Sequence, residues 1–185
     1  MLIVGLGNPG QTYEHNRHNI GFLVIDELIC RFNATEVKKS LFQGALFKSN
    51  SHYFLKPITY MNLSGNSIAA VKQFYKIDEV IVIHDDLDLL FGALRFKKGG
   101  GHGGHNGLKS TDAMISKEYV RVRMGIGKPE HKGEVASYVL SDFSSQERPY
   151  IHEWINRAAS SVEMLLKDRV ENVASKYSVK KIEIE

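Results

Sequence analysis

The sequence predicts an α/β fold: a single domain over residues 1–185, with a mixed, mostly parallel twisted sheet that is flanked by helices on both faces. Two short, continuous apolar runs, Leu2–Leu6 and Val80–Ile83, are typical of strands buried inside a parallel sheet. Segments with helical spacing of apolar residues alternate with these and other strand-like runs. A chain of 185 residues is also large enough to enclose one hydrophobic core.

The first half of the chain begins with the Leu2–Leu6 strand, which ends in glycines. Apolar residues at positions 20, 23, 24, 28 and 32 then recur with helical spacing, which predicts a helix over 20–32. Leu41–Lys48 and Tyr53–Lys56 are strand-like, and Ser49-Asn50-Ser51 between them has the composition of a hairpin turn. A weaker helical pattern predicts a second helix over 64–75.

Residues 99–107 form a glycine-rich loop with six glycines in nine positions, between a strand-like Leu94–Lys98 and a helical segment at Leu108–Ile115. Glycine loses the most backbone entropy on folding, so such a run is kept where the chain needs positive φ or a ligand approaches the backbone. Its histidines and asparagine, and the basic residues before it, suit an anionic ligand. We interpret the loop as part of a site. The alternative is a flexible linker, but linkers are rich in serine and lack flanking apolar segments.

The last third of the chain contains one alternating strand and one long helix. Tyr119–Ile126 alternates, so one face is expected to pack in the core while the other presents the guanidinium groups of Arg121 and Arg123. Ser144 and Glu147 have the spacing of a capping box, which precedes an amphipathic helix from about residue 151 to 166.

Composition and charge exclude several classes of protein. Hydrophobic residues make up 43% of the chain and charged residues 24%, which are ordinary globular values. The single cysteine, Cys30, which we expect in the core, excludes a thiolate metal cluster and favours a reducing compartment. No basic leader and no run of about 20 apolar residues is present, so we expect a cytoplasmic protein without membrane association. A net charge of +3 is too small to require a nucleic-acid partner by itself.

Residues 5–10, Gly-Leu-Gly-Asn-Pro-Gly, match the dinucleotide-binding fingerprint and follow a strand. That fingerprint requires a helix to open at its second glycine, but Pro9 and a polar stretch delay any helical pattern until about Ile20. The acid that should hold the ribose would be Asp26 or Glu27, which fall inside the predicted helix. We therefore interpret these residues as a sharp turn that presents Asn8, and reject the nucleotide interpretation.

The loop after the first strand carries Tyr13, Arg17, His18 and Asn19, and sites of α/β sheets form at this end of the strands. The Val80–Ile83 strand ends with polar residues as well. If the two strands are neighbours, Asp85 comes within reach of His18. A carboxylate beside an imidazole selects the tautomer whose free nitrogen can accept a proton, and it stabilises the imidazolium that forms. A structural histidine is the alternative for His18.

A metal site is a second interpretation of the acidic cluster after Val80–Ile83. Acids on a strand-exit turn are common surface chemistry, however, and histidines on glycine-rich backbone lack a rigid element to fix coordination. We expect no catalytic metal here. The candidate ligands are Asp85, Asp86, Asp88, His84, His102 and His105.

Two asparagines precede helical segments and have two interpretations. Asn62 follows Pro57-Ile58-Thr59-Tyr60, and Asn106 ends the glycine-rich loop. Local sequence favours N-terminal capping for Asn62, whereas a ligand-facing carboxamide is the alternative for both. With Asn8 they make three carboxamides at three loop exits, and no Gly-x-Ser-x-Gly nucleophile motif is present. This combination indicates a site that orients a neutral polar substrate around a histidine.

Basic and aromatic residues near these loops suit a nucleic-acid end. Arg95, Lys97 and Lys98 lead into the glycine-rich loop, and Arg121 and Arg123 share one face of the alternating strand, so phosphate is the natural ligand. Tyr13 and Tyr60 are suited to stacking on the bases of single-stranded RNA. A solvated charged face is the alternative interpretation.

Six segments, in order, carry a family resemblance that covers nearly the whole chain. They are Val4-Gly-Leu-Gly-Asn-Pro-Gly10 with Tyr13, Arg17-His-Asn19, Tyr60-Met-Asn-Leu-Ser-Gly65, His84-Asp-Asp-Leu-Asp88, Gly99-Gly-Gly-His-Gly-Gly-His-Asn-Gly-Leu-Lys109 and Arg121-Val-Arg-Met-Gly-Ile-Gly127. Each segment alone is weak, but the combination is highly specific. With these residues the chain resembles the bacterial peptidyl-tRNA hydrolase family.

The resemblance implies hydrolysis of the ester that joins a peptide to the 3′ end of tRNA, which recycles tRNA from aborted translation. It implies that His18 is the general base that activates water, that Asp85 orients it, and that Asn8 contacts the substrate near the ester. It further implies no metal or cofactor and a monomer without an obligate protein partner. The acceptor stem, the 3′ end and the peptide would be bound by Tyr13, Tyr60, Asn62 and Asn106, and the 5′ phosphate by Lys97 and Arg123.

Small departures from the family pattern lie beside the site. Asn16 replaces a frequent threonine, and Leu90-Phe91 lacks a common proline, so we expect these departures to affect fine positioning more than activity. We interpret residues 127–139 as a lid. The main competing function is a non-catalytic RNA-binding protein, because plastid intron-splicing factors share this fold; the presence of His18, Asp85 and the three asparagines favours the enzyme.

Overall fold

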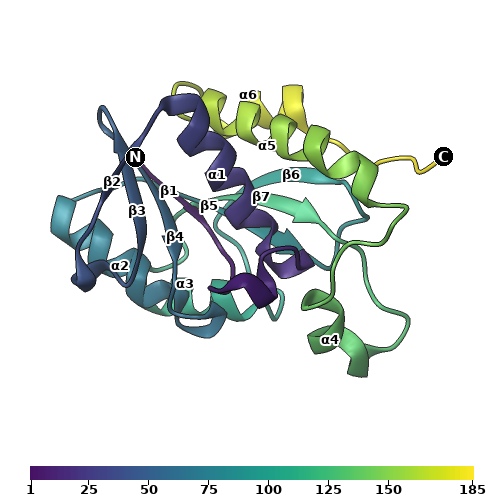
Figure 1. Ribbon diagram of the computed structural model, residues 1–185. Coiled ribbons are helices and arrows are strands. Elements are labelled where there is room, and N and C mark those ends of the chain that lie inside the picture. The colour runs from purple at the N-terminus through teal and green to yellow at the C-terminus, as the bar shows by residue number, and fades with distance from the viewer.

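The computed structural model describes residues 1–185 and has a single seven-stranded sheet with the strand order β2-β3-β4-β1-β5-β7-β6 (Figure 1). The mixed sheet predicted from the sequence is confirmed: β4, β1, β5 and β7 are parallel neighbours, whereas β2–β3, β3–β4 and β6–β7 pair antiparallel. Five strands therefore run in one direction, and only β3 and β6 oppose them. The strands are β1 (Leu2–Gly5), β2 (Thr35–Val37), β3 (Gly44–Ser49), β4 (His52–Pro57), β5 (Val80–Asp86), β6 (Leu94–Lys98) and β7 (Val120–Gly125).

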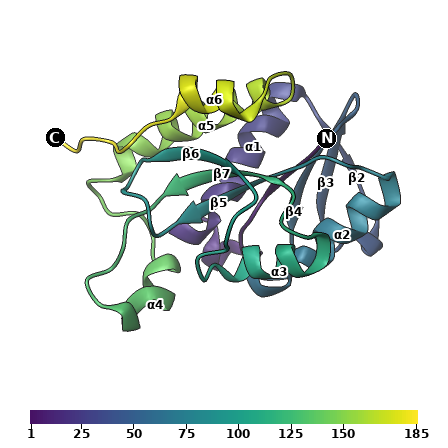
Figure 2. The same cartoon turned by 180° about the vertical axis from the view of Figure 1, so that it is seen from behind.

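Helices cover both faces of the sheet, as expected for parallel strands (Figures 1 and 2). On one face α1, α5 and α6 enclose a core that includes Ile3, Ile83 and Trp154, and on the other α2 and α3 enclose Val4 and Leu108. Neighbouring residues of β1 thus enter different cores, because side chains alternate along a strand. The helices are α1 (Ile20–Phe32), α2 (Ser64–Tyr75), α3 (Asn106–Ile115), α4 (Val135–Val139), α5 (Ile151–Leu165) and α6 (Val170–Tyr177).

Strong periodicity predicted the long elements well. Helices α1 and α2 have the predicted bounds, and Glu147 Oε1 and Ser144 Oγ accept each other's backbone N–H groups, as the capping box before α5 requires. Residues 41 and 42, predicted to begin a strand, belong instead to a 3-10 turn, Ser40–Phe42. The prediction that Cys30 is in the core is wrong: it is exposed, because it lies two residues beyond the buried Leu28 and faces solvent. No helix is long and apolar enough to cross a membrane.

Two glycines place the start of α1 against the end of β1. A Cβ atom on Gly5 would lie 2.1 Å from the carbonyl oxygen of Gly21, and one on Gly21 would lie 2.5 Å from that of Ile83. Any larger residue would therefore push α1 away from the sheet. This close approach brings the residues just before α1 to the carboxyl end of β5, where sites of α/β sheets form.

Candidate active site

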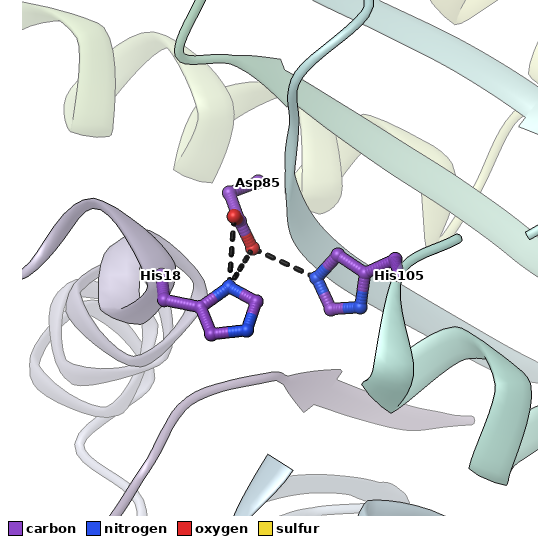
Figure 3. Close-up of side chains that lie close together, drawn as sticks. All are labelled: His18, Asp85 and His105. Carbon is purple, nitrogen blue, oxygen red and sulfur yellow. Dashed lines mark hydrogen bonds and ion pairs between the residues drawn. The ribbon is translucent and has the colours of Figure 1, made fainter. Parts of the chain in front are cut away.

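His18 and Asp85 lie at the carboxyl ends of β1 and β5 and contact each other. His18 is part of a 3-10 turn, Arg17–Asn19, that leads into α1, and Asp85 belongs to β5 itself, which is longer than the predicted strand. The Nδ1 atom of His18 lies 2.8 Å and 3.0 Å from the two carboxylate oxygens of Asp85 (Figure 3). The proximity that the sequence predicted is confirmed.

A second imidazole contacts the same carboxylate. His105 Nε2 lies 2.8 Å from Asp85 Oδ1, so Asp85 sits between two rings (Figure 3). The other nitrogen of His105, Nδ1, accepts hydrogen bonds from the backbone N–H groups of Gly107 and Leu108 at the start of α3. Because Nδ1 is an acceptor, the proton of a neutral His105 lies on Nε2 and is donated to Asp85.

These contacts determine the tautomer of the neutral His18 ring. Burial by itself raises the pKa of the Asp85 carboxyl group, but the charges and hydrogen bonds of His18 and His105 outweigh it and hold that pKa well below its usual range. An ionised carboxylate only accepts hydrogen bonds, so His18 donates its Nδ1 proton and the lone pair is on Nε2. The Nε2 atom of His18 can therefore accept a proton and act as a base.

His84, next to Asp85, is buried behind the pair. Its Nδ1 lies 2.8 Å from the backbone oxygen of Asp85, and its Nε2 is buried without a hydrogen-bond partner. Burial, followed by the charge of His105, lowers the pKa of His84 from 6.5 to about 4. The His84 ring is thus neutral near pH 7, and it is packed beside Asp85.

The pKa of His84 predicts acid sensitivity. The unfolded chain binds a proton at His84 below about pH 6.5, whereas the folded chain does not until about pH 4, so stability present above pH 6.5 is lost as the pH falls. We expect the free energy of unfolding to drop by about 2–3 kcal/mol more between pH 7 and 4.5 in the wild type than in His84→Asn. Urea unfolding at the two pH values measures this, and equal drops in both proteins would contradict it.

A cavity of about 580 Å³ adjoins the pair, and five predicted site residues line it: His18, Asp85, Lys97, Asn106 and Arg123. The only hydrogen bond of the Arg123 side chain inside the protein joins Nε to Asp86 Oδ2 at 2.9 Å, so both Nη groups remain available. The side chain of Asn106 is exposed and makes no hydrogen bond within the protein. The base thus shares one cavity with two cations, Lys97 and Arg123.

The glycine-rich loop borders this cavity, and four of its glycines, at 99, 100, 103 and 104, have positive φ. The prediction that β7 presents two solvent-facing guanidinium groups is wrong for Arg121, which is 3% exposed. Its Nη atoms donate to the carbonyls of Gly100 and Gly101 and to Asp112, so it fixes the path of the loop. Strand alternation placed Arg121 on the correct face of β7, but the glycine-rich loop covers that part of the face.

The remaining site residues gather around the turn at 60–62, outside the cavity lining. Asn8 Oδ1 accepts from the backbone N–H of Met61 at 2.8 Å, and the rings of Tyr13 and Tyr60 are 6.5 Å apart. Tyr60 has φ +66° and ψ 157°, a conformation that costs roughly 1–3 kcal/mol for a side chain other than glycine. This strained residue directs the Met61 N–H group to Asn8. The capping interpretation of Asn62 is wrong, because its side chain caps no helix.

The interpretation of Asn106 as a cap is also wrong: the cap of α3 is the His105 side chain. Sequence reasoning considered His105 as a metal ligand and as a ring nitrogen for an anionic ligand, but not as a helix cap. A signal was present, since a polar residue directly before Asn106-Gly-Leu108 occupies the N-cap position, but histidine is not among the usual caps.

His18, Asp85 and His105 also present ligand atoms within 4.8 Å of one another. Their nitrogen–oxygen distances of 2.8 Å are those of direct hydrogen bonds, whereas two ligands of one tetrahedral zinc ion lie about 3.4 Å apart. The other two acids considered as ligands, Asp86 and Asp88, pair with Arg123 and Lys128. The geometry is therefore that of a hydrogen-bonded acid–base group.

Known proteins are similar to nearly the whole length of this chain. The family model for peptidyl-tRNA hydrolase matches residues 2–185. A peptidyl-tRNA hydrolase of Sulfurimonas denitrificans is 66% identical over 180 residues, 97% of each chain, and one of Sulfurovum is 56% identical over 184 residues, 98% of this chain and 97% of the relative. The crystal structure of peptidyl-tRNA hydrolase from Acinetobacter baumannii is 37% identical and superimposes with a TM-score of 0.91, covering 97% of this chain and 95% of that one.

Proposed function

Because this chain belongs to the peptidyl-tRNA hydrolase family, and so hydrolyses the ester between a peptide and tRNA, we propose that His18 is its general base and activates water. The free Nε2 of His18 and its place in the cavity wall support this role. Asp85 holds the ring in the basic tautomer, and His105 holds Asp85. We also propose that the enzyme acts as a monomer without an obligate protein partner. Because translation generates the substrate, we place the enzyme in the cytoplasm.

The reaction needs one water molecule and no covalent intermediate. His18 Nε2 takes a proton from water as the oxygen attacks the ester carbonyl carbon, and Asp85 stabilises the imidazolium. The tetrahedral oxyanion accepts hydrogen bonds from carboxamide N–H groups, for which the exposed Asn106 is suited. Collapse breaks the bond to the 3′ oxygen of the tRNA, which receives the proton from the imidazolium. The free peptide acid and free tRNA leave.

Asn8 selects acylated substrates in this proposal. Its Oδ1 accepts from Met61 and its backbone exchanges two hydrogen bonds with the Asn19 side chain, so the side chain is held in place with the N–H groups of Nδ2 available for the substrate. These donors suit the carbonyl of a peptide bond better than a protonated α-amino group, which is itself a donor. Tyr13, Tyr60 and Asn62 lie beside it and bind the 3′ end of the tRNA and the attached peptide.

The observation that carries the proposal is the shared cavity, which places Lys97 and Arg123 on the wall of the space that His18 enters. Phosphate of the tRNA acceptor stem, including its 5′ phosphate, pairs with these cations. The free Nη groups of Arg123 suit bidentate contact with phosphate oxygens. Binding of the phosphate thus positions the ester over the base.

The chain contains a matched control for this interaction. Lys97 and Lys98 are neighbours on β6, but side chains alternate, and Lys98 lines a separate hollow near Glu118 and Tyr119. We expect Lys97→Ala to raise KM for N-acetyl-aminoacyl-tRNA about five- to tenfold and to make the negative slope of log(kcat/KM) against log salt shallower by about one. Lys98→Ala should change neither.

Arg123→Gln should raise KM in the same way as Lys97→Ala. The measurement is steady-state hydrolysis at several salt concentrations, with kcat within about twofold of wild type throughout. Equal effects of Lys97→Ala and Lys98→Ala would indicate that only overall charge attracts the tRNA, and the proposed placement of the phosphate would then be wrong.

A further inference from the structure

Arg17, the residue before His18, is a buried cation that the proposed mechanism does not use. It is 8% exposed. Its Nη1 atom donates to Ser141 Oγ at 2.5 Å and to the carbonyl of Asp142 at 2.6 Å, and Nη2 donates to Glu147 Oε1 at 2.7 Å. Its backbone N–H also donates to the carbonyl of Ser141 at 2.9 Å. One side chain therefore joins segments more than 120 residues apart in the sequence.

Ser141 and Asp142 directly follow the lid segment, residues 127–139, whereas Glu147 lies further along the chain, in the capping box before α5. Helix α4 within this segment projects from the body of the molecule (Figures 1 and 2). It packs chiefly against the Arg17–Asn19 turn and against Lys132–Glu134, the short turn directly before α4. The guanidinium carbon of Arg17 lies 4.4 Å from the ring centre of Tyr138, in the last turn of α4. Asn16 adds a hydrogen bond to the carbonyl of Leu140. The lid is thus fastened beside His18.

The lid also forms part of the cavity that contains His18, Lys97 and Arg123. The residues it contributes are Lys132, Gly133, Val135, Ala136 and Val139. If α4 were free to swing, this wall would have to be ordered each time a substrate bound, which lowers affinity without altering the chemical step. His18 itself would stay in place, because Asp85 holds its ring independently.

Arginine is well suited to such a junction. A buried charge is costly unless it is paired and hydrogen-bonded; Glu147 and two oxygens just beyond the lid accept from the Nη groups, whereas Nε is buried without a partner. The planar guanidinium can stack on Tyr138 while its edge donates, which a lysine ammonium cannot do.

We propose that Arg17 is a positioning residue for substrate binding, which fastens the C-terminal end of the lid to the turn that carries His18. The inference rests on the proposed function in one respect, that the cavity binds the tRNA end of the substrate. A purely structural role is the competing explanation, because Glu147 also accepts the N–H of Ser144 in the capping box before α5. The two explanations predict different coupling between substitutions at Arg17 and at Tyr138.

A double-mutant cycle between Arg17 and Tyr138 tests the lid contact. We expect Arg17→Lys to raise KM for N-acetyl-aminoacyl-tRNA about tenfold, with kcat and its pH dependence within about twofold of wild type. Tyr138→Leu should raise KM about fivefold, and the double variant should be no worse than Arg17→Lys alone, because both changes release the same contact. Arg157→Lys, an exposed arginine on α5, serves as the matched control and should behave as wild type.

The structural explanation predicts the opposite pattern. Arg17→Lys would then lower Tm together with Glu147→Gln, leave KM unchanged well below Tm, and show no coupling to Tyr138; that result would overturn the proposal. If Arg17→Lys does not fold, Ser141→Ala removes one Nη1 contact and should still raise KM severalfold, and an unchanged KM would count against the proposal. Failure of His18 as the base would appear in kcat, so the two tests remain separate.

Discussion

Replacing His18 with asparagine is expected to lower kcat for N-acetyl-aminoacyl-tRNA about 10²- to 10⁴-fold, the contribution of a positioned general base, and to leave KM nearly unchanged. Asparagine can still hydrogen-bond to Asp85 but has no basic nitrogen to take a proton from water. The effect should appear in single-turnover as well as steady-state rates, because the chemical step itself is slowed.

The control for this variant is His152→Asn, which changes an exposed histidine on α5 and should leave both constants at wild-type values. Acid-quenched wild-type reactions with a labelled acyl group provide a second measurement. Direct attack by water leaves no label on the protein, so a labelled acyl-protein adduct, or a His18→Asn enzyme with full activity, would show that another residue performs the chemistry.

Replacing Asp85 with asparagine is expected to lower kcat about 10²- to 10³-fold, although the shape of the site is kept. The carboxylate accepts from two imidazoles, whereas a carboxamide offers one acceptor oxygen and one donor N–H₂ group. The backbone N–H groups at the start of α3 keep the proton of His105 on Nε2, so His105 still donates to the one remaining side-chain oxygen. His18 then faces the N–H₂ group, must accept through Nδ1, and carries its proton on Nε2, where the base should be.

Asp88→Asn is the matched control, because Asp88 lies three residues along the chain in an exposed ion pair with Lys128. It should reduce kcat less than twofold, in line with the small energy of surface pairs. Nitrogen chemical shifts of the His18 ring report the tautomer directly. If Asp85→Asn kept the wild-type tautomer and rate, the carboxylate would have no part in orienting the base.

Much of the site was predictable because it depends on strand ends. His18 and Asp85 follow two apolar runs that pair in parallel, and parallel neighbours bring their carboxyl ends to one edge of the sheet. Lys97, Asn106 and Arg123 were predictable for a related reason, since the glycine-rich loop leads from β6 to the same edge. Helices α1 and α2 followed from periodicity, which is a local property of the sequence.

The features that sequence reasoning missed depend on what covers a residue. Alternation placed Arg121 on the correct face of β7, but only the folded path of the loop buries it. The competition between Asn106 and His105 for the cap of α3 is decided by the loop conformation, which positive-φ glycines make hard to infer. The positive φ of Tyr60 has no local sequence signal, and it precedes the Met61 N–H group that donates to Asn8, a residue more than 50 positions away.

The imidazole of His105 serves two partners, and this sharing makes main-chain geometry part of the acid–base chemistry. Two peptide N–H groups of α3 decide which nitrogen of that ring carries hydrogen, and the ring in turn occupies one oxygen of Asp85. The tautomers of the two histidines therefore depend on the backbone conformation of the first turn of α3. Surface substitutions that keep this turn helical leave the tautomers unchanged, whereas fraying of the turn removes the hydrogen bonds that fix them.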